Sequence, residues 1–456
     1  MEQLSIRDLY TMGEEEIGKH QGERLVFEGY VRNNRCLGQV GFISLNDGSC
    51  FSNLQIVYDA NVTDPSIRLG ASVICEGELN LTPEARQPFE LKNAKVTLVG
   101  NTTDSYPLQK KKTSFEYLRT IPQWRMKTNT FNAVFRVRSA LAYYIHEYFF
   151  NHGFCWIHTP ILTANDCEGE GQTFNVCADY KKPAEFFGND NVHLTVSGQL
   201  HVEPFALAYG KVYTFGPTFR AEKSNTVRHA AEFWMIEPEI AWAHLSDDMD
   251  LMEDMLKYVV KKTIEHCPDD MAFFNERIDT GLKDRLDEFV SKPFARVTYR
   301  EAVAKLNEAQ ANGVKFENDD IRFGTDFGSE HEKYLTEKIY KGPIFLTDYP
   351  KEIKAFYMKQ NDDGETVGAV DLLVPSIGEL CGGSERECDY DKLLDRMNEL
   401  HMNIDAYQWY LDLRKNGSIP HSGFGLGFER LVMLVTGMNN IRDVLPYPRC
   451  YKDMEF

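Results

Sequence analysis

Five short segments between residues 20 and 100 limit what the start of this chain can fold into. Each has the length of one strand, several alternate apolar and polar side chains, and turn-forming residues such as Asn46-Asp47-Gly48 separate them. The segments are residues 25–31, 41–45, 53–58, 72–77 and 91–99. Five short strands in such a short stretch suit a small closed barrel, and we predict an OB-fold domain over residues 1–103.

The 456 residues are too many for one ordinary domain, and two or three are expected. Residues 104–127 contain two prolines and the run Lys110-Lys111-Lys112, which indicates a linker. The lysines are either a solvated surface or part of a hinge that touches nucleic-acid phosphates. Helical and strand-like patches alternate over residues 128–456, with a charged, mainly helical insertion around 240–340. We therefore predict an α+β fold.

The charge of the chain is unevenly distributed. A net charge of −19 argues against a general nucleic-acid binder, whose surface is normally basic. Residues 1–125, however, hold 14 Lys and Arg against 16 Asp and Glu, so this part is nearly neutral. It is the easier part of the chain to dock on a phosphate backbone.

Signals for export and membrane insertion are absent from the sequence. No run of about 18 apolar residues predicts a membrane helix, and the first residues lack the basic and apolar regions of a signal peptide. The ten cysteines include no C-x-x-C pair, which favours reduced thiols over zinc. We predict a cytoplasmic protein with no membrane partner.

A predicted hairpin at residues 212–236 carries the first chemical cluster. Phe219-Arg220-Ala221-Glu222 ends its first strand, Arg228-His229 lies in its loop, and Phe233 begins its second strand. Arginine forks grip phosphates, and a phenylalanine can stack on a planar base. Spacing alone leaves an exposed, charged hairpin equally open.

A glycine-rich stretch near the end of the chain is the second cluster. In Gly423-Phe424-Gly425-Leu426-Gly427-Phe428-Glu429-Arg430, a glycine at every second position permits close approach of the backbone to a ligand. Arg430 begins an apolar helix, where the helix dipole disfavours a cation, and this indicates a functional task. A packing turn is the alternative.

Two carboxylates near glycines form the third cluster. Asp371 and Glu379 precede Gly382-Gly383, and magnesium takes one or two protein carboxylates together with substrate phosphates. A surface loop of acids is the alternative on spacing alone. Because the chain has no Walker loop and no Rossmann fingerprint, these clusters would have to bind any nucleotide themselves.

Taken together, the clusters resemble the signature motifs of the class II aminoacyl-tRNA synthetases, in the aspartate/asparagine subgroup. The first motif would be the helix through Arg136-Val137-Arg138-Ser139-Ala140 to Thr159-Pro160, the second residues 219–239, and the third Gly425-Leu426-Gly427-Phe428-Glu429-Arg430. The resemblance covers nearly the whole chain apart from residues 240–340. It implies an antiparallel catalytic sheet flanked by helices, and a homodimer built through the helix at about 128–160.

The resemblance also implies a role for each site residue. Arg220 would hold the α-phosphate and the amino-acid carboxylate, and Asp371 and Glu379 would hold magnesium. Phe233 and Arg430 would enclose the adenine, with Arg220 and Arg430 as the catalytic residues. The implied ATP-binding residues are Arg220, Glu222, Arg228, His229, Phe233, Glu379, Gly427, Glu429 and Arg430. The implied amino-acid-binding residues are Glu168, Gln199, Arg220, Glu222 and Arg386.

The choice between asparagine and aspartate depends on charge. Aspartate enzymes of the family carry a lysine three residues after the equivalent of Gln199, and Val202 stands there in this chain. A buried substrate carboxylate without a counter-charge is costly, and Glu222 could accept the amide N–H of asparagine. The resemblance therefore implies activation of L-asparagine and its transfer to tRNA(Asn). An aspartate-activating enzyme, discriminating or not, and an asparagine-forming amide ligase on the same catalytic fold stay open.

The barrel carries three residues for tRNA. Arg35, Phe42 and Gln55 match positions that grip the anticodon in this subgroup. An aromatic side chain on the face of a barrel stacks well on bases. Without the resemblance, Phe42 would be interpreted as a core residue of its strand.

Overall fold

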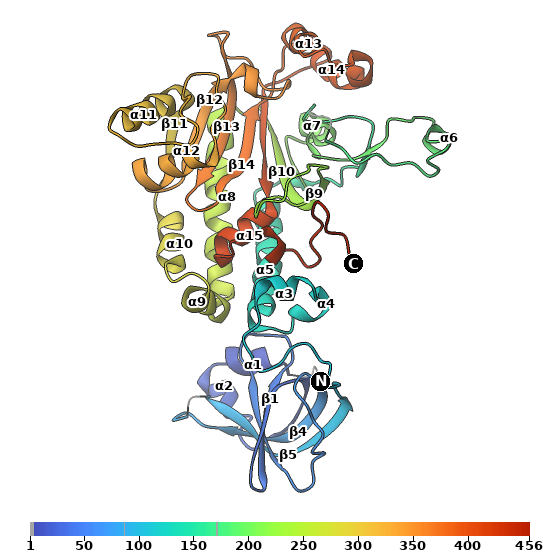
Figure 1. The fold of residues 1–456 in the computed structure, drawn as a ribbon, viewed down its shortest axis with the longest axis vertical. Helices are drawn as coiled ribbons and strands as arrows, with labels where there is room; N and C mark the ends of the chain where they lie inside the picture. Colours follow the sequence, from blue (N-terminus) through green and yellow to red (C-terminus); the bar gives the residue numbers. More distant parts are fainter. Residues whose placement is uncertain (1–3, 86, 170–171) are drawn as a thin grey trace. The chain divides into compact units, whose positions relative to one another are not determined.

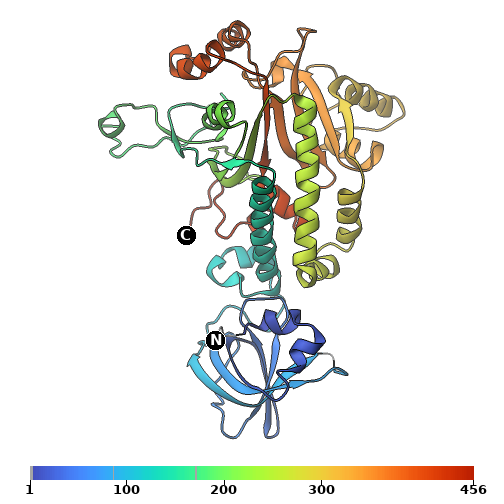
Figure 2. The same ribbon diagram turned by 180° about the vertical axis from the view of Figure 1, so that it is seen from behind.

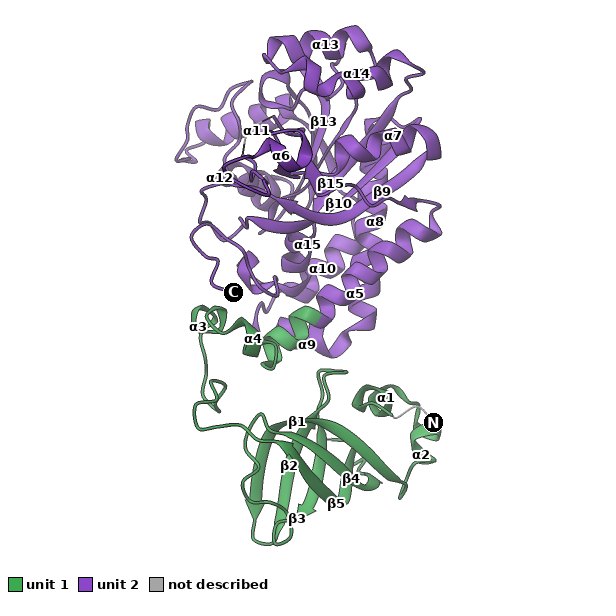
Figure 3. Ribbon diagram, turned by 90° about the vertical axis from the view of Figure 1, so that its right-hand side faces the viewer, with its two compact units in different colours: residues 1–135 green, residues 136–456 purple. Residues whose placement is uncertain are grey.

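The computed structural model describes residues 4–85, 87–169 and 172–456. The chain forms two compact units, residues 1–135 and residues 136–456 (Figure 3). Their boundary lies inside the long helix α5 (Asn129–Asn151), whereas the sequence placed the start of the second part at residue 128.

The first unit contains a closed barrel with the strand order β1-β2-β3-β5-β4. Its strands are β1 (Arg24–Leu37), β2 (Val40–Asn46), β3 (Leu54–Asp59), β4 (Ser72–Leu81) and β5 (Phe89–Gly100). Every second residue of β3 is buried, beginning with Leu54 and Ile56, so the alternation seen in the sequence fills the barrel interior. The five-stranded barrel predicted from the sequence is confirmed.

Four short helices also belong to the first unit. They are α1 (Ile6–Thr11), α2 (Glu14–Gly18), α3 (Phe115–Arg119) and α4 (Pro122–Arg125). Ser5 caps α1 and Ser114 caps α3 through their hydroxyl groups, and Pro122 occupies the first turn of α4, where its missing N–H costs nothing.

The second unit is built on an eight-stranded sheet with the order β11-β12-β13-β14-β15-β10-β9-β6 (Figure 1). Its strands are β6 (Cys155–Trp156), β9 (Lys211–Phe219), β10 (Glu232–Ala241), β11 (Ala295–Thr298), β12 (Ile344–Pro350), β13 (Thr366–Val374), β14 (Gly378–Glu385) and β15 (His421–Gly427). The central pairs are antiparallel, and only the two outermost strands pair in parallel. A smaller sheet pairs β7 (Leu162–Thr163) with β8 (His193–Leu194).

Helices flank this sheet. The long helix α8 (Leu245–His266) runs along one face and packs on β13, β14 and β15, as Figure 2 shows. The other helices are α6 (Ala184–Phe187), α7 (Gln199–Tyr209), α9 (Pro268–Arg277), α10 (Leu282–Ser291), α11 (Tyr299–Ala311), α12 (Ser329–Lys333), α13 (Tyr390–Glu399), α14 (Gln408–Lys415) and α15 (Phe428–Thr436). Short 3-10 or π segments are Tyr334–Ile339, Lys351–Ile353, Ile404–Tyr407 and Ile441–Asp443. The α+β fold, with an antiparallel sheet and flanking helices, is confirmed.

Residues 240–340 hold α8 to α12 and one strand that the sequence did not predict. This strand, β11, joins the edge of the sheet in parallel with β12. In the parts of the chain that the structure describes, no helix combines the length and the apolar character needed to cross a membrane.

Candidate active site

Strands β9 and β10 form the hairpin that the sequence predicted. Phe219 pairs with Glu232 at the loop end of the hairpin, and the N–H of Arg220 donates to the carbonyl of Ala231 at 3.0 Å. Residues 221–230 form the connecting loop. Arg228 and His229 thus lie on a loop, and Phe233 lies on a strand of the sheet.

The glycine-rich stretch forms β15 and the start of α15. A Cβ on Gly423 would lie 2.3 Å from the carbonyl oxygen of Pro238, and one on Gly425 would lie 2.5 Å from Cε of Met235. These glycines therefore allow β15 to pack closely against β10. Gly427 is the N-cap of α15 and Arg430 lies in its first turn, as predicted.

A cavity of about 110 Å³ lies between this hairpin and the start of α15. It brings together all nine residues that the resemblance assigned to ATP: Arg220, Glu222, Arg228, His229, Phe233, Glu379, Gly427, Glu429 and Arg430. Four of the nine are Arg or His side chains, which suits a ligand with several negative charges.

Glu429 and Arg430 are both held by protein partners. The buried carboxylate of Glu429 accepts from Arg138 at 2.7 Å and from the N–H of Trp234 at 3.0 Å. Glu429 thus links α5, β10 and α15, which is a supporting position. Arg430 donates to the carbonyl of Glu379 at 2.6 Å, and its guanidinium lies 3.5 Å from the Glu379 carboxylate.

A second, larger cavity of about 610 Å³ adjoins the first, and Arg220 lines both. Its lining includes Glu168, Gln199 and Arg386 from the set that the resemblance assigned to the amino acid. Glu222, the fifth member of that set, lines the smaller cavity and not the larger one. It lies 3.6 Å from His229. Val202 is fully buried in an apolar cluster with Ala206 and does not line the larger cavity.

The larger cavity contains a buried carboxylate that the sequence analysis missed. Glu237, on β10, accepts from the hydroxyl of Ser197 and from the N–H of Gly198, the latter at 2.8 Å. Burial raises the pKa of Glu237, and Ser197, Gly198, Arg220 and Arg386 act in the opposite direction. The sequence does contain a signal for this residue, since a glutamate within an apolar strand is rarely buried without a partner.

Arg386 follows strand β14 and is almost completely buried. It forms an ion pair with Glu239 and donates to the hydroxyl of Ser384 at 2.7 Å. Since Glu239 already balances its charge, Arg386 offers the cavity hydrogen-bond donors beside a neutralised ion pair. An arginine whose charge is already balanced suits an uncharged carbonyl oxygen better than an arginine without a partner carboxylate would.

Asp371 and Glu379 lie on neighbouring strands and face the same point. Asp371 pairs with Gly382 across the sheet, and a Cβ on Gly382 would lie 3.0 Å from Oε1 of Glu379 and 3.3 Å from Oδ1 of Asp371. Burial raises the pKa of Asp371, whose carboxylate accepts from Lys354 at 2.6 Å. Burial also acts to raise the pKa of Glu379, but Arg430, Lys354 and Arg220 outweigh it and lower that pKa.

This donor set fits magnesium that also binds substrate phosphates. Among the residues that the structure describes, no group of three or more His, Cys, Asp or Glu side chains could hold a metal ion. Two convergent carboxylates without a third protein ligand match a hard cation that keeps phosphate and water ligands.

The three predicted anticodon residues lie on the barrel. Arg35 and Phe42 are cross-strand partners on β1 and β2, and the Arg35 guanidinium is 5.1 Å from the Phe42 ring centre. Phe42 is half-exposed between the buried Gly41 and Ile43, so it faces outward and is not a core residue. Gln55, on β3, donates to Glu90 at 2.9 Å.

Comparisons with known proteins agree with this architecture. The chain is 52% identical to the asparagine–tRNA ligase of Acetivibrio thermocellus and 49% identical to that of a Bacillus cereus strain, over the full length of each. Among solved structures, it resembles the asparaginyl-tRNA synthetase of Pyrococcus horikoshii complexed with asparaginyl-adenylate. That match has a TM-score of 0.86 and 32% identity, and covers 100% of this chain and 99% of the other.

A putative aspartyl-tRNA synthetase from Leishmania major shares the fold alone, with a TM-score of 0.77 and 21% identity over 95% of this chain and 92% of that one. The family model described as tRNA synthetases class II (D, K and N) matches residues 116–451. With these full-length relatives, the match shows that the chain belongs to the class II tRNA synthetases, in the family of the aspartate, lysine and asparagine enzymes.

Proposed function

We propose that this chain is an asparagine–tRNA ligase. It would activate L-asparagine with ATP, release pyrophosphate, and transfer the asparaginyl group to the 3′ end of tRNA(Asn). The observation that carries the proposal is the pair of adjoining cavities that share Arg220, one with cations for a triphosphate and one with Glu237 and Arg386. The full-length relatives named asparagine–tRNA ligase support the same assignment.

The two cavities suit an in-line displacement at the α-phosphorus. The carboxylate of asparagine, in the larger cavity, would attack the α-phosphate of ATP, and pyrophosphate would leave towards Arg228 and His229. Arg220 would bridge the carboxylate and the α-phosphate and stabilise the charge that develops between them. Phe233 and Arg430 would enclose the adenine. Asp371 and Glu379 would hold magnesium, which neutralises phosphate charge when bound.

Glu237 and Arg386 would distinguish asparagine from aspartate. Arg386 influences the pKa of Glu237, so the two groups interact within the same cavity. Asparagine can donate its amide N–H to Glu237 and accept from Arg386 at its oxygen. Aspartate would place a second carboxylate beside Glu237, which is costly where water is excluded. This arrangement supports asparagine over an aspartate-activating enzyme.

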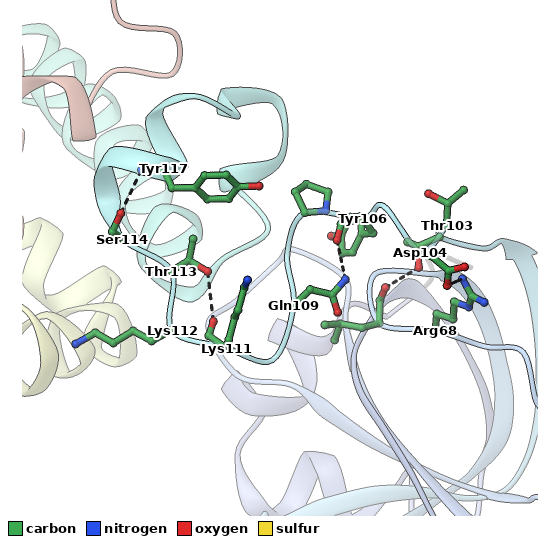
Figure 4. A pocket seen from close by; sticks show the side chains of 13 residues that line it. Arg68, Thr103, Asp104, Tyr106, Gln109, Lys111, Lys112, Thr113, Ser114 and Tyr117 are labelled. Carbon is green, nitrogen blue, oxygen red and sulfur yellow. Dashed lines mark hydrogen bonds and ion pairs between the residues drawn. The ribbon is translucent and has the colours of Figure 1, made fainter.

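For tRNA, we assign anticodon binding to the barrel over residues 1–103, the hinge to residues 104–127, and catalysis to residues 128–456. A cavity of about 760 Å³ within the first unit is lined by residues of the hinge together with Arg68, Leu69, Thr102 and Thr103 (Figure 4). Lys111 extends towards the ring of Tyr117 in this cavity. A cation and an aromatic ring that line one cavity suit a phosphate and its base, which supports the hinge interpretation of the lysine run.

Replacing Phe42 with alanine is expected to weaken tRNA charging without affecting amino-acid activation. Stacking of one base on an aromatic ring is worth about 1–3 kcal/mol, so the KM for tRNA should rise about tenfold or more. Aminoacylation and ATP–pyrophosphate exchange would be measured on the same preparation. An equal loss in both reactions would make Phe42 a structural residue of the barrel.

A homodimer through residues 128–160 is the expected assembly. Tyr143 and Phe150 on α5 and Trp156 on β6 are large exposed apolar side chains within this range. Changing Phe150 to glutamate should convert a dimer into a monomer in light scattering, whereas Leu37 to glutamate on the barrel should not. A monomeric wild-type enzyme would contradict the proposed homodimer.

We expect the enzyme to act in the cytoplasm, where tRNA is charged.

The function is tested by charging purified transcripts. Radiolabelled asparagine should be attached to a tRNA(Asn) transcript, with little transfer to a tRNA(Asp) transcript. Formation of free asparagine from aspartate and ammonia, with no charged tRNA, would instead identify an amide ligase.

A further inference from the structure

The glycine at position 378 marks a close approach between side chains from distant parts of the chain. A Cβ on Gly378 would lie 2.8 Å from Nη1 of Arg228 and 3.0 Å from Oε2 of Glu332. Gly378 also has a φ of +82°, a conformation that favours glycine. The guanidinium of Arg228 and the carboxylate of Glu332 therefore both border the space that a side chain at position 378 would fill.

Arg228 lies on a loop, so its position depends on what anchors it. Its guanidinium donates to the carbonyl of Ser376 at 3.2 Å, and the N–H of Ser376 donates to Glu337 at 3.2 Å. Burial, followed by the nearby carboxylates of Glu379 and Asp371, raises the pKa of Glu332 to about 7, and Arg228 opposes that rise. Glu332 and Glu337 are thus the two carboxylates that interact electrostatically with Arg228, and Glu332 has the larger effect on its pKa.

Helix α12 holds Glu332 rigidly. The preceding residue, His331, is almost fully buried and donates through Nε2 to the carbonyl of Asn318 at 2.9 Å. Its Nδ1 accepts from the N–H of Gly328 at 3.1 Å, and its ring packs edge-on against Phe316. The N–H of Glu332 also donates to the carbonyl of Gly328 at 3.3 Å, so the backbone at Glu332 is anchored independently of the loop that carries Arg228.

We propose that Glu332 is a positioning residue that holds Arg228 where the outer phosphates of ATP bind. A long side chain on a loop loses rotamer freedom when it binds, and a fixed carboxylate beside it reduces that loss in advance. The inference rests on the proposed function, in which Arg228 grips the phosphates that leave as pyrophosphate. It gives the 240–340 segment, which carries α12, a part in nucleotide binding.

The test compares ligands that do and do not carry the outer phosphates. Binding of ATP, pyrophosphate and AMP to Glu332→Ala would be measured by calorimetry at mildly alkaline pH. Affinities for ATP and pyrophosphate should fall about tenfold, the effect of losing one interaction with a charged group, while the affinity for AMP stays within twofold. Lys333→Ala, exposed on the same helix, is the matched control and should change none of the three.

Two further variants complete the experiment. Glu332→Gln keeps the shape of the side chain but removes its charge, so its affinities for ATP and pyrophosphate should fall about as far as those of Glu332→Ala, because Glu332 acts on Arg228 through its charge. If the alanine variant does not fold, the Glu332→Gln variant is used for the test instead. In an Arg228→Ala background, Glu332→Ala should have no additional effect on ATP.

Equal losses for AMP, unchanged ATP binding, or full additivity with Arg228→Ala would each overturn the proposal. These binding measurements need no amino acid. They therefore give their answer separately from asparagine-dependent exchange, whose absence in the wild type would instead contradict the proposed function.

Discussion

Replacing Arg430 with alanine is expected to slow asparagine-dependent ATP–pyrophosphate exchange by about 10²–10³-fold, as removal of one preorganised charged donor does in other enzymes. Two losses combine in this variant. The smaller cavity, to which we assign the adenine, loses a cation and a planar surface that line it together with Phe233. Glu379 loses the guanidinium that lies 3.5 Å from its carboxylate and lowers its pKa. Glu379 would then be less fit to hold magnesium.

The matched control for this variant is Arg277→Ala, an exposed arginine at the end of α9 in the same unit. Its exchange rate should equal that of the wild type, and the thermal unfolding midpoints of both variants should stay close to the wild-type value. A correctly folded Arg430→Ala enzyme with near-normal exchange would remove Arg430 from the active site.

Glu237→Gln is expected to lower kcat/KM for asparagine by about 10²-fold and to narrow its preference over aspartate. A site built to accept a substrate N–H loses more for its own substrate than it gains for the analogue, because other polar groups are left imperfectly paired. Glutamine keeps an acceptor for Ser197 or Gly198, so the fold should survive. Exchange kinetics with both amino acids measure the effect.

Glu222→Gln is the informative partner variant. The sequence assigned the amide-reading role to Glu222, but this residue lies with His229 in the smaller cavity. Its replacement should therefore raise the KM for ATP and leave the preference for asparagine intact. If Glu222→Gln erodes the preference and Glu237→Gln keeps it, the original assignment is right and Glu237 has only a structural role.

Local patterns made the barrel and the residues of the smaller cavity predictable. Strand alternation has a period of two, so the five barrel strands could be recognised without knowing their partners. The nine residues assigned to ATP come from three contiguous stretches, which together resemble the signature motifs of the family. Pairing between β10 and β15 then brings Phe233 and Arg430 to one cavity.

Residues whose roles depend on tertiary contacts could not be predicted. Glu237 and Glu239 alternate with apolar residues on one strand, and only the fold reveals that one meets Ser197 and the other Arg386. Glu332 lies in a charged segment whose acidic residues cannot be told apart by their sequence pattern. Its approach to Arg228 depends on the turn at Gly378, which is distant in the sequence. Strand β11 is only four residues long, too short for its alternation to be recognised.

The most direct test of the account is ATP–pyrophosphate exchange by the wild-type enzyme with asparagine and with aspartate, each over a full concentration range. Glu237 would repel a second carboxylate, and Arg386 is already balanced by Glu239. We therefore expect exchange that depends on asparagine, with kcat/KM for aspartate lower by about 10⁴-fold. Comparable exchange with both amino acids, or exchange with aspartate alone, would contradict the assignment of asparagine as the substrate.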